Sequence, residues 1–210
     1  ALRWGDWSIF AGQAFPNWTK ERVAVPKQKQ FEIPAHWAKW RAMDYGFIHP
    51  AVMGWFTADP QTKRVYIYRA VAVSNLSDEQ QAELMSQMSP PEERYSANYA
   101  SPDMWASTAK KAGRIQTSVD EFKAKGIILT RADNDRVNGV RKIDRLLFDG
   151  PDGLPMIQVF EEYYDVFRCM ETLVREDAMK GKNPEDVKKV DGDDAFDMLK
   201  YGLTNINQTP

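Results

Sequence analysis

The chain has 210 residues, of which 43% are hydrophobic and 12% aromatic, and its formal net charge is -2. These values fit one compact domain with a substantial core, and a charge so near zero excludes no class of partner. The single cysteine, Cys169, excludes an internal disulfide, and with only His36 and His49 beside it a Cys/His zinc site is not expected, so any metal is expected to be held by oxygen ligands. No stretch approaches the ~20 apolar residues of a membrane span, and no signal-peptide pattern opens the chain, so the sequence predicts a soluble, unexported protein.

The opening segment, residues 1–30, is apolar and rich in aromatic side chains. We expect it to be the end of a preceding part of a longer protein, which leaves residues 31–205 as the folded domain. The final residues, 206–210, are expected to fray. The aromatic side chains of the opening are Trp4, Trp7, Phe10, Phe15 and Trp18.

Three β-strands come next, and we expect them to form a meander. Runs of β-branched and aromatic residues predict strands at 40–46, 51–58 and 65–73, the last two joined by the turn sequence DPQTKR. Ser77 and Gln80 then have the spacing of a capping box, which predicts a helix up to about Met88.

The rest of the chain alternates strands and helices. This α/β order allows the first and fourth strands to lie side by side in one sheet. A polar loop over 181–192 precedes the last, acidic helix. Further strands are predicted at 95–100, 127–131 and 156–160, and helices at 115–125, 134–148 and 164–176.

Aspartates stand at the ends of these elements. Asp44 ends the first strand, Asp103 lies just beyond the fourth, and the stretch DGDDAFDMLKYGL, residues 191–203, places four aspartates at the start of the last helix. At about 100° per residue the aspartates at 193, 194 and 197 share one face of that helix, so their repulsion predicts either a solvated face or a neutralising cation. If the strands are neighbours and the helix packs across them, these carboxylates meet as in a two-metal site for phosphodiester hydrolysis.

Each acid also has a purely structural interpretation. Asp44 fits a turn, Asp103 fits the start of a helix after Pro102, and the acidic cluster fits a capped and solvated helix start. Only their conjunction favours a metal site. An EF-hand is excluded, because the positions that need glycine and glutamate hold Phe196 and Gly202.

Four segments, in this order and spacing, resemble the nuclease domain of the large terminase subunit of tailed bacteriophages: WRAMDYGFIHPA, YASPDMW, GIILTRADNDRVNGVRKIDRLL and DGDDAFDMLKYGL. The resemblance covers nearly the whole chain. It implies an RNase H-like α/β fold, in which a mixed sheet with a three-strand meander is flanked by helices on both faces. It also implies an endonuclease that cuts concatemeric double-stranded viral DNA during genome packaging, with two Mg²⁺ or Mn²⁺ ions and little sequence specificity. The implied partners are DNA, the portal protein and the small terminase subunit, and the implied location is the host cell cytoplasm, at the procapsid portal.

The resemblance assigns the metal-binding and catalytic acids as well. The first acid of the family falls on Asp44, and the last acidic motif falls on Asp193 and Asp194, of which Asp194 is preferred. Members differ in the ligand used here, which keeps Asp197 as a further candidate. Many relatives place the middle aspartate directly before the proline, where this chain has Ser101, and Asp103 can replace it because positions two apart in an extended strand face the same side.

A complete terminase also carries an ATPase motor. This sequence has no G-x-x-x-x-G-K-[ST] phosphate loop, so we expect the chain to cut DNA but not to pump it. Residues 1–30 resemble the connection that leaves the motor domain.

Positive charge near the acids is expected to bind DNA phosphates. An ordinary solvated surface is the alternative for each basic residue, and Arg136 has a second alternative, a carboxylate pair that supports the fold. His49 is interpreted as structural, because in a two-metal mechanism a metal activates the water. The candidate DNA-binding residues are Arg136, Arg141, Lys142, Lys182, Lys188 and Lys189.

Two other functions remain open. One is another RNase H-like enzyme, such as a junction resolvase or a transposase, which branched and linear duplexes distinguish. The other is a non-catalytic DNA-binding or assembly module, whose acids bind cations without forming a product.

Overall fold

The computed structural model describes residues 12–106, 108–111 and 114–205. Its strands are β1 (Ala24–Val25), β2 (Lys39–Asp44), β3 (Ala51–Ala58), β4 (Val65–Val73), β5 (Asn98–Ala100), β6 (Thr108–Lys111), β7 (Arg114–Thr117), β8 (Thr130–Arg131) and β9 (Ile157–Phe160). Its α-helices are α1 (Lys20–Val23), α2 (Asp78–Gln87), α3 (Ser118–Ala124), α4 (Arg136–Leu146) and α5 (Asp194–Thr204). Short 3₁₀-helices are η1 (Lys27–Lys29), η2 (Pro102–Trp105) and η4 (Ala178–Lys180), and a longer one is η3 (Glu161–Glu171).

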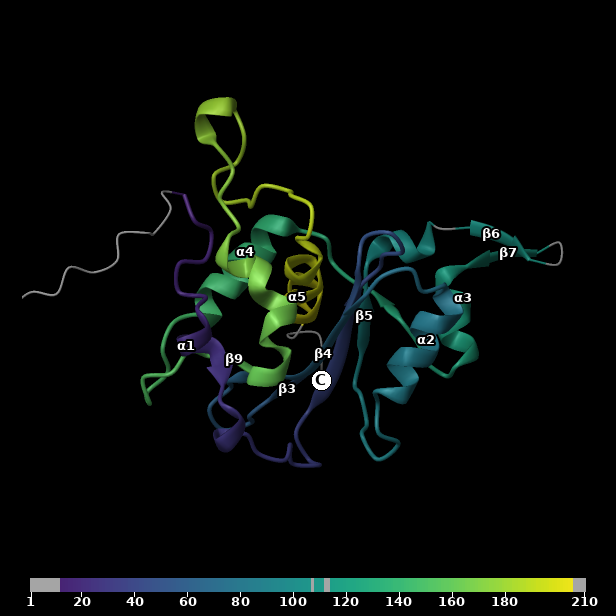
Figure 1. Ribbon diagram of the computed structural model, residues 1–210, viewed down its shortest axis with the longest axis horizontal. Helices are drawn as coiled ribbons and strands as arrows, with labels where there is room; N and C mark the ends of the chain where they lie inside the picture. The colour runs from purple at the N-terminus through teal and green to yellow at the C-terminus, as the bar shows by residue number, and fades with distance from the viewer. Residues whose placement is uncertain (1–11, 107, 112–113, 206–210) are drawn as a thin grey trace, which may run out of the picture.

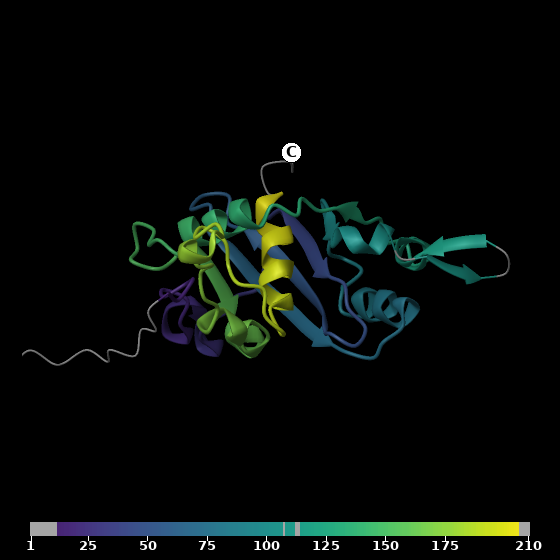
Figure 2. The same cartoon turned by 90° about the horizontal axis from the view of Figure 1, so that it is seen from above.

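Within the described residues, one mixed sheet has the strand order β1-β9-β4-β3-β2-β5-β8, and β6 pairs only with β7. The meander β2-β3-β4 is antiparallel, and β5 lies parallel beside β2, so both predictions are confirmed. Helices α4, α5 and η3 cover one face of the sheet, and α2 and α3 cover the other (Figures 1 and 2). The predicted fold class, a mixed α/β sheet between helices, is therefore correct.

The strands of the meander are buried on both faces. Along β3, Phe56 packs in the core beneath α5, and its neighbour Trp55 packs in the core beneath α2. Successive side chains of a strand point to opposite faces, so a sheet covered on both sides needs apolar residues at almost every position. This explains why β3 is a nearly continuous apolar run rather than an alternating one, whereas β2 also buries Lys39 and Arg41.

Helix α5 runs across the sheet and packs between α4 and η3 (Figure 2). Two glycines allow this close approach. A Cβ on Gly202 of α5 would lie 2.5 Å from the Phe56 ring, and a Cβ on Gly139 of α4 would lie 2.3 Å from Cγ of Lys200. Side chains at these positions would push α5 away from the sheet and from α4.

The helix predicted at 164–176 is different in the structure. It is a 3₁₀-helix, begins at Glu161 and ends at Glu171. Its buried side chains Tyr164, Phe167 and Met170 recur every three residues, which matches the 3.0 residues per turn of a 3₁₀-helix rather than the 3.6 of an α-helix. The prediction of a helix with buried apolar residues in this region is correct, but the helix type is 3₁₀ rather than α.

Other predicted boundaries also change. The strand predicted at 40–46 is Lys39–Asp44, and the helix predicted at 134–148 is Arg136–Leu146. The helix predicted at 115–125 begins at Ser118, after a capping box of Thr117 and Asp120, because Arg114–Thr117 pairs with β6. This hairpin was not predicted, and it projects from the body beside α3 (Figure 1). The strand predicted at 127–131 starts only at Thr130, because the Ile127 N–H bonds to the Phe122 carbonyl at the end of α3, and the strand predicted at 95–100 starts at Asn98.

The described part of the expected connecting segment, residues 12–30, packs against the domain. Phe15 and Trp18 are fully buried, and β1 adds a parallel strand beside β9. The predictions for residues 1–11 and 206–210 lie outside the described residues. Within the described ranges, no helix combines the length and the apolar character needed to cross a membrane.

Candidate active site

Three neighbouring strands end at the same edge of the sheet. β2, β5 and β8 are parallel, so their carboxyl ends lie together. Asp44 is the last residue of β2, Asp103 lies in η2 directly after β5, and Asn134 follows β8. Sites in open α/β sheets form beyond the carboxyl ends of parallel strands, so this edge is the expected place for chemistry.

The start of α5 completes this edge. A cavity of about 840 Å³ is lined by acids from three distant parts of the chain, together with Asn134, Arg136, Lys189 and Tyr201. The structure thus brings together all the acids that the sequence singled out. These acids are Asp44, Asp103, Asp191, Asp193, Asp194 and Asp197.

The pKa of Asp44 is strongly raised in this cavity. Burial, then the nearby Asp197 and Asp194 carboxylates, raise the pKa of Asp44 to about 8, and Lys200 offsets only part of this. Burial also raises the pKa of Asp193 and that of Asp194. Among the described residues, the Asp44 carboxylate forms no hydrogen bond or ion pair, so it lacks a direct positive partner.

Two basic side chains pair with Asp193 and Asp197 at the start of α5. Arg136 contacts Asp197 at 3.0 Å, Asp193 at 3.4 Å and Asp186 at 3.4 Å. Lys200, fully buried, donates to Asp197 at 2.8 Å and to Asn134 at 2.6 Å. The repulsion predicted from the sequence is therefore relieved at Asp193 and Asp197 by the side chains of Arg136 and Lys200. The alternative that Arg136 pairs with a carboxylate is confirmed.

A capped, solvated helix start, the structural alternative for the acidic cluster, does not describe Asp193. Asp193 is the N-cap residue of α5, yet its side chain makes no capping hydrogen bond and is only 4% exposed. Asp194 is half-buried and forms no ion pair among the described residues, which distinguishes it from its two neighbours on the helix face.

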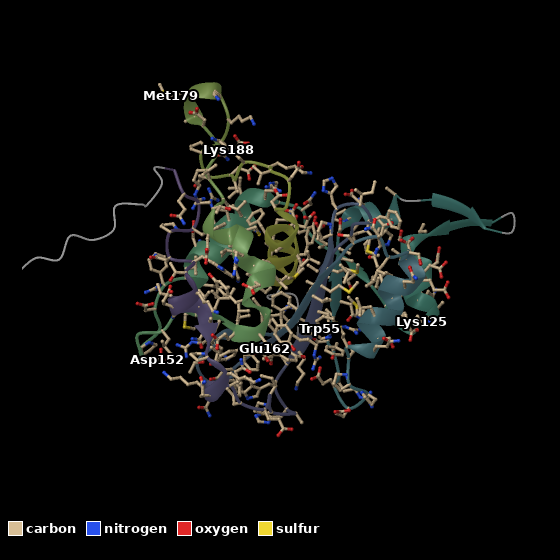
Figure 3. The ribbon with its side chains drawn as sticks, viewed as in Figure 1. Trp55, Lys125, Asp152, Glu162, Met179 and Lys188 are labelled. Atoms are coloured by element: carbon tan, nitrogen blue, oxygen red, sulfur yellow. The ribbon has the colours of Figure 1, made fainter. Side chains whose placement is uncertain are left out.

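The basic candidates lie in different surroundings. Arg136 and Lys189 line the acid cavity. Arg141 pairs with Glu185 at 2.6 Å, and Lys182 pairs with Glu176 at 2.9 Å, so these two are engaged outside it. Lys142 on α4 is half-buried, and neither it nor Lys188 lines the cavity. Figure 3 shows Lys188 and Met179 on a segment that rises above α4, and Met179 is 98% exposed at its tip.

Sequence reasoning missed two residues of this site. Lys200 is a single lysine in an apolar helix, which is the signal that a buried ion pair leaves in a sequence. Asn134 follows β8, whose strand was predicted, at the same edge as Asp44, but an amide three residues beyond a strand end carries no signal that it will meet Lys200. Lys200 holds Asp197 directly, three positions along the same helix, and Asn134 accepts a second hydrogen bond from the Lys200 ammonium.

The donor groups fit a divalent cation by their chemistry. In the described ranges, no three His, Cys, Asp or Glu side chains already form a group that would hold a metal ion. Carboxylate oxygens are nevertheless the ligands that Mg²⁺ and Mn²⁺ prefer, and Asp44 is a half-buried carboxylate with a raised pKa and no direct positive partner among the described residues. Asp44, Asp103 and Asp194 are the residues of this cavity that would hold such an ion.

The stability of the metal-free protein should fall as the pH rises, because of Asp44. Its folded-state pKa of about 8 lies above the value of about 3.9 in unfolded chains, so its stabilising protonated form is fully present below about pH 4 and is lost as pH rises to about 8. Urea unfolding in EDTA, compared between wild type and Asp44→Asn, measures this effect. Between pH 5 and 8 the unfolding free energy of the wild type should fall relative to that of Asp44→Asn. A difference that does not change with pH would contradict the raised pKa of Asp44.

The sequence matches no protein-family model and no curated protein. The structure is similar to solved large terminases. It matches the large terminase of the thermophilic bacteriophage D6E with a TM-score of 0.71 and 16% identity, over 93% of this chain and 46% of that one. It matches the P22 large terminase nuclease domain with a TM-score of 0.67 and 17% identity, over 91% and 90%.

A third match is the large terminase nuclease domain of bacteriophage SPP1 with bound Mn, with a TM-score of 0.56 and 16% identity, over 78% of this chain and 84% of that one. The chain thus spans about half the length of the D6E terminase and nearly all of the isolated P22 nuclease domain. At identities this low, the structural similarity establishes the fold alone. The chain therefore has the fold of a large-terminase nuclease domain.

Proposed function

We propose that this chain is a divalent-metal-dependent endonuclease that cuts concatemeric double-stranded viral DNA during genome packaging, with little sequence preference. The observation that carries the proposal is the single cavity into which β2, η2 and α5 bring Asp44, Asp103 and Asp194. The likeness to the P22 nuclease domain and to the Mn-bound SPP1 domain supports it.

Bound divalent ions would activate a water and stabilise the leaving oxygen. The chain's own groups prepare the cavity for this. Asp44, Asp103 and Asp194 would hold two Mg²⁺ or Mn²⁺ ions through their carboxylate oxygens, and Asp44 would contribute to holding both. Arg136 and Lys200 occupy oxygens of Asp193 and Asp197, which makes Asp194 the preferred ligand of α5. These pairs keep the start of α5 at the edge of the sheet.

DNA would reach the acids past the basic residues of the cavity mouth. Lys189 lines the cavity and is exposed, so we assign it a phosphate contact. Lys188 and Lys182 lie on the same projecting segment, and Arg141 and Lys142 lie on α4; all four are proposed as weaker, outer contacts. We assign Arg136 chiefly to holding the acids.

The remaining parts of the proposal come from the resemblance to large terminases. They are an ATPase motor elsewhere in the protein, connected through residues 1–30, and work at the procapsid portal in the host cytoplasm together with the portal protein and the small terminase subunit. Residues 31–205 form the nuclease unit in this proposal.

The test is incubation of supercoiled plasmid with this chain in Mn²⁺, in Mg²⁺ and in EDTA. Nicked and linear products that form in either metal and not in EDTA support the endonuclease. A folded protein that binds metal without forming product favours the non-catalytic module instead. Faster cutting of a four-way junction than of linear duplex would favour a resolvase.

A further inference from the structure

A second polar cavity, of about 410 Å³, lies on the opposite face of the sheet from the acids. We call it the Arg41 cavity; its lining includes Arg41, Arg94, Tyr95, Asn98 and Thr130. Arg41 precedes Asp44 by three positions in β2, and side chains an odd number of positions apart point to opposite faces of a sheet. The Arg41 cavity is therefore separated from the acid cavity by the sheet itself.

Arg41 is a buried cation, and its side chain reaches this cavity. The residue is only 6% exposed, and burial lowers its pKa. Its Nε donates to Oδ1 of Asn98 at 2.7 Å, its Nη1 donates to Oγ of Ser89 at 2.8 Å, and its guanidinium stacks 4.2 Å from the centre of the Tyr95 ring. All three contacts are to uncharged groups. Across the described residues, no carboxylate forms a salt bridge with Arg41, and its Nη2 donates no hydrogen bond.

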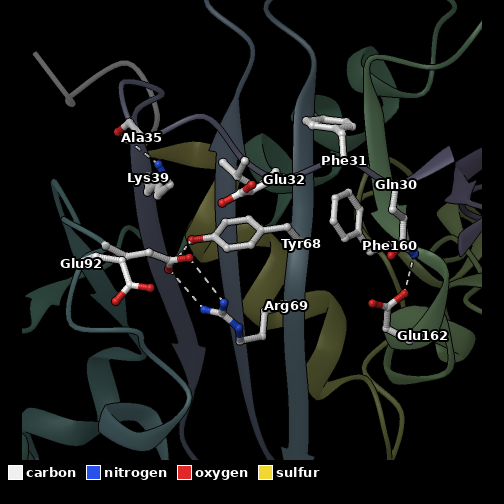
Figure 4. A pocket seen from close by; sticks show the side chains of 12 residues that line it. Gln30, Phe31, Glu32, Ala35, Lys39, Tyr68, Arg69, Glu92, Phe160 and Glu162 are labelled. Carbon is white, nitrogen blue, oxygen red and sulfur yellow. Dashed lines mark hydrogen bonds and ion pairs between the residues drawn. The ribbon is translucent and has the colours of Figure 1, made fainter. Parts of the chain in front are cut away.

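Glu93 also lines the Arg41 cavity, but its carboxylate is engaged by other side chains. Glu93 accepts from Arg69 at 3.2 Å and from the Tyr68 hydroxyl at 3.0 Å, and it also accepts from the Tyr95 hydroxyl. Figure 4 shows Arg69 and Tyr68 directed at this one carboxylate. Glu93 therefore acts on Arg41 only through space. A buried charge without a direct carboxylate partner is costly, and an anion that approached Arg41 would offset part of this cost.

Arg94 places a second positive charge at the rim of the cavity. It is exposed, and its one hydrogen bond within the described residues is a long one of 3.4 Å to the Pro91 carbonyl. Thr130, also exposed, is the lining residue that β8 contributes. The lining thus offers guanidinium groups at its base and its rim, and the planar fork of a guanidinium matches the oxygens of a phosphate.

We propose that the Arg41 cavity binds a phosphate group, either as inorganic phosphate or as the phosphate of a nucleotide, with Arg41 at its base and Arg94 at its rim. Its volume falls within the range of about 300–1,000 Å³ that is usual for small-molecule sites, so it has room for more than the phosphate alone. Phosphate binding at this site does not depend on the nuclease activity, because the two cavities share no residue.

The test is isothermal titration calorimetry with sodium phosphate and, separately, with ADP, at constant ionic strength and in EDTA, so that no metal at the acid cavity contributes. We expect saturable binding that Arg41→Gln weakens by about tenfold or more, because a charged hydrogen bond is lost, and that Arg94→Gln weakens by a smaller factor. Arg168→Gln is the matched control, since Arg168 is exposed, pairs with Asp165 and lies outside the cavity; it should leave binding unchanged.

Each possible result either supports or overturns the proposed phosphate site. Tighter binding of ADP than of phosphate assigns the site to a nucleotide, and equal binding assigns it to the phosphate group alone. Absence of heat with both probes, or binding that both cavity variants leave intact, would overturn the proposal. If Arg41→Gln does not fold, Arg94→Gln carries the test, because an exposed side chain can be replaced without disturbing the core.

Discussion

Asp44→Asn should reduce the rate of plasmid cutting by at least about a hundredfold, because the loss of one preorganised charge at a reaction centre typically costs on the order of 10²–10³ in rate. The fold should survive. Burial and neighbouring acids raise the pKa of Asp44 to about 8, so in the metal-free protein at neutral pH the neutral amide replaces a carboxyl that is itself largely protonated. The measurement is the initial rate of nicking in Mn²⁺, beside a thermal melt of the same sample.

Asp165→Asn is the matched control for this variant. Asp165 is 76% exposed and lies outside the acid cavity, so the same chemical change there should leave the rate intact. Asp194→Asn should resemble Asp44→Asn, with lost cutting and normal stability. A folded Asp44→Asn protein that cuts at the wild-type rate would refute the proposed site.

Arg136→Gln should lower the unfolding free energy by about 3 kcal/mol, because breaking a buried ion pair leaves its partner charges uncompensated at a cost of roughly 3–5 kcal/mol. Arg136 contacts three carboxylates, at Asp186, Asp193 and Asp197, and its guanidinium also lies 5.0 Å from the centre of the Phe196 ring. Arg136 is itself partly exposed, which places the expected loss at the lower end of this range. Urea unfolding followed by circular dichroism measures it.

Arg141→Gln provides the comparison on the same helix. Its side chain is 55% exposed and pairs with the equally exposed Glu185, so the loss should stay within about 1 kcal/mol. Equal effects of the two substitutions would mean that Arg136 does not hold the start of α5. In that case Asp193 and Asp197 would need another source of positive charge.

The sequence predicted the central part of the fold because its signals there are local. β3 and β4 were placed at their observed bounds, since each is an apolar run between turn residues and a strand needs little else. The period of η3 and the hairpin β6-β7 were missed. A three-residue apolar repeat is easily read as an α-helical one, and TAKK and RIQT carry too few apolar residues to predict strands before they pair.

The acids of the site were predictable for a similar reason, because each stands at the end of an element that the sequence shows. Their ion pairs were only partly predictable. Arg136 was weighed as a carboxylate partner, but its choice of Asp193 and Asp197 depends on how closely α4 approaches α5. That distance is set by Gly139 against Lys200, a contact between residues 61 positions apart in the sequence numbering. No pattern within either helix reveals it.

The place of α5 in the chain has a consequence for biosynthesis. The ribosome releases every strand of the sheet before it releases residues 194–204, so a nascent chain can pair β2 with β5 and carry Asp44 and Asp103 at the sheet edge while Asp194 is still untranslated. Under the proposed mechanism such a chain lacks one of its ligands. Under this mechanism, DNA cleavage requires that translation has passed α5, and an incomplete translation product does not cut DNA.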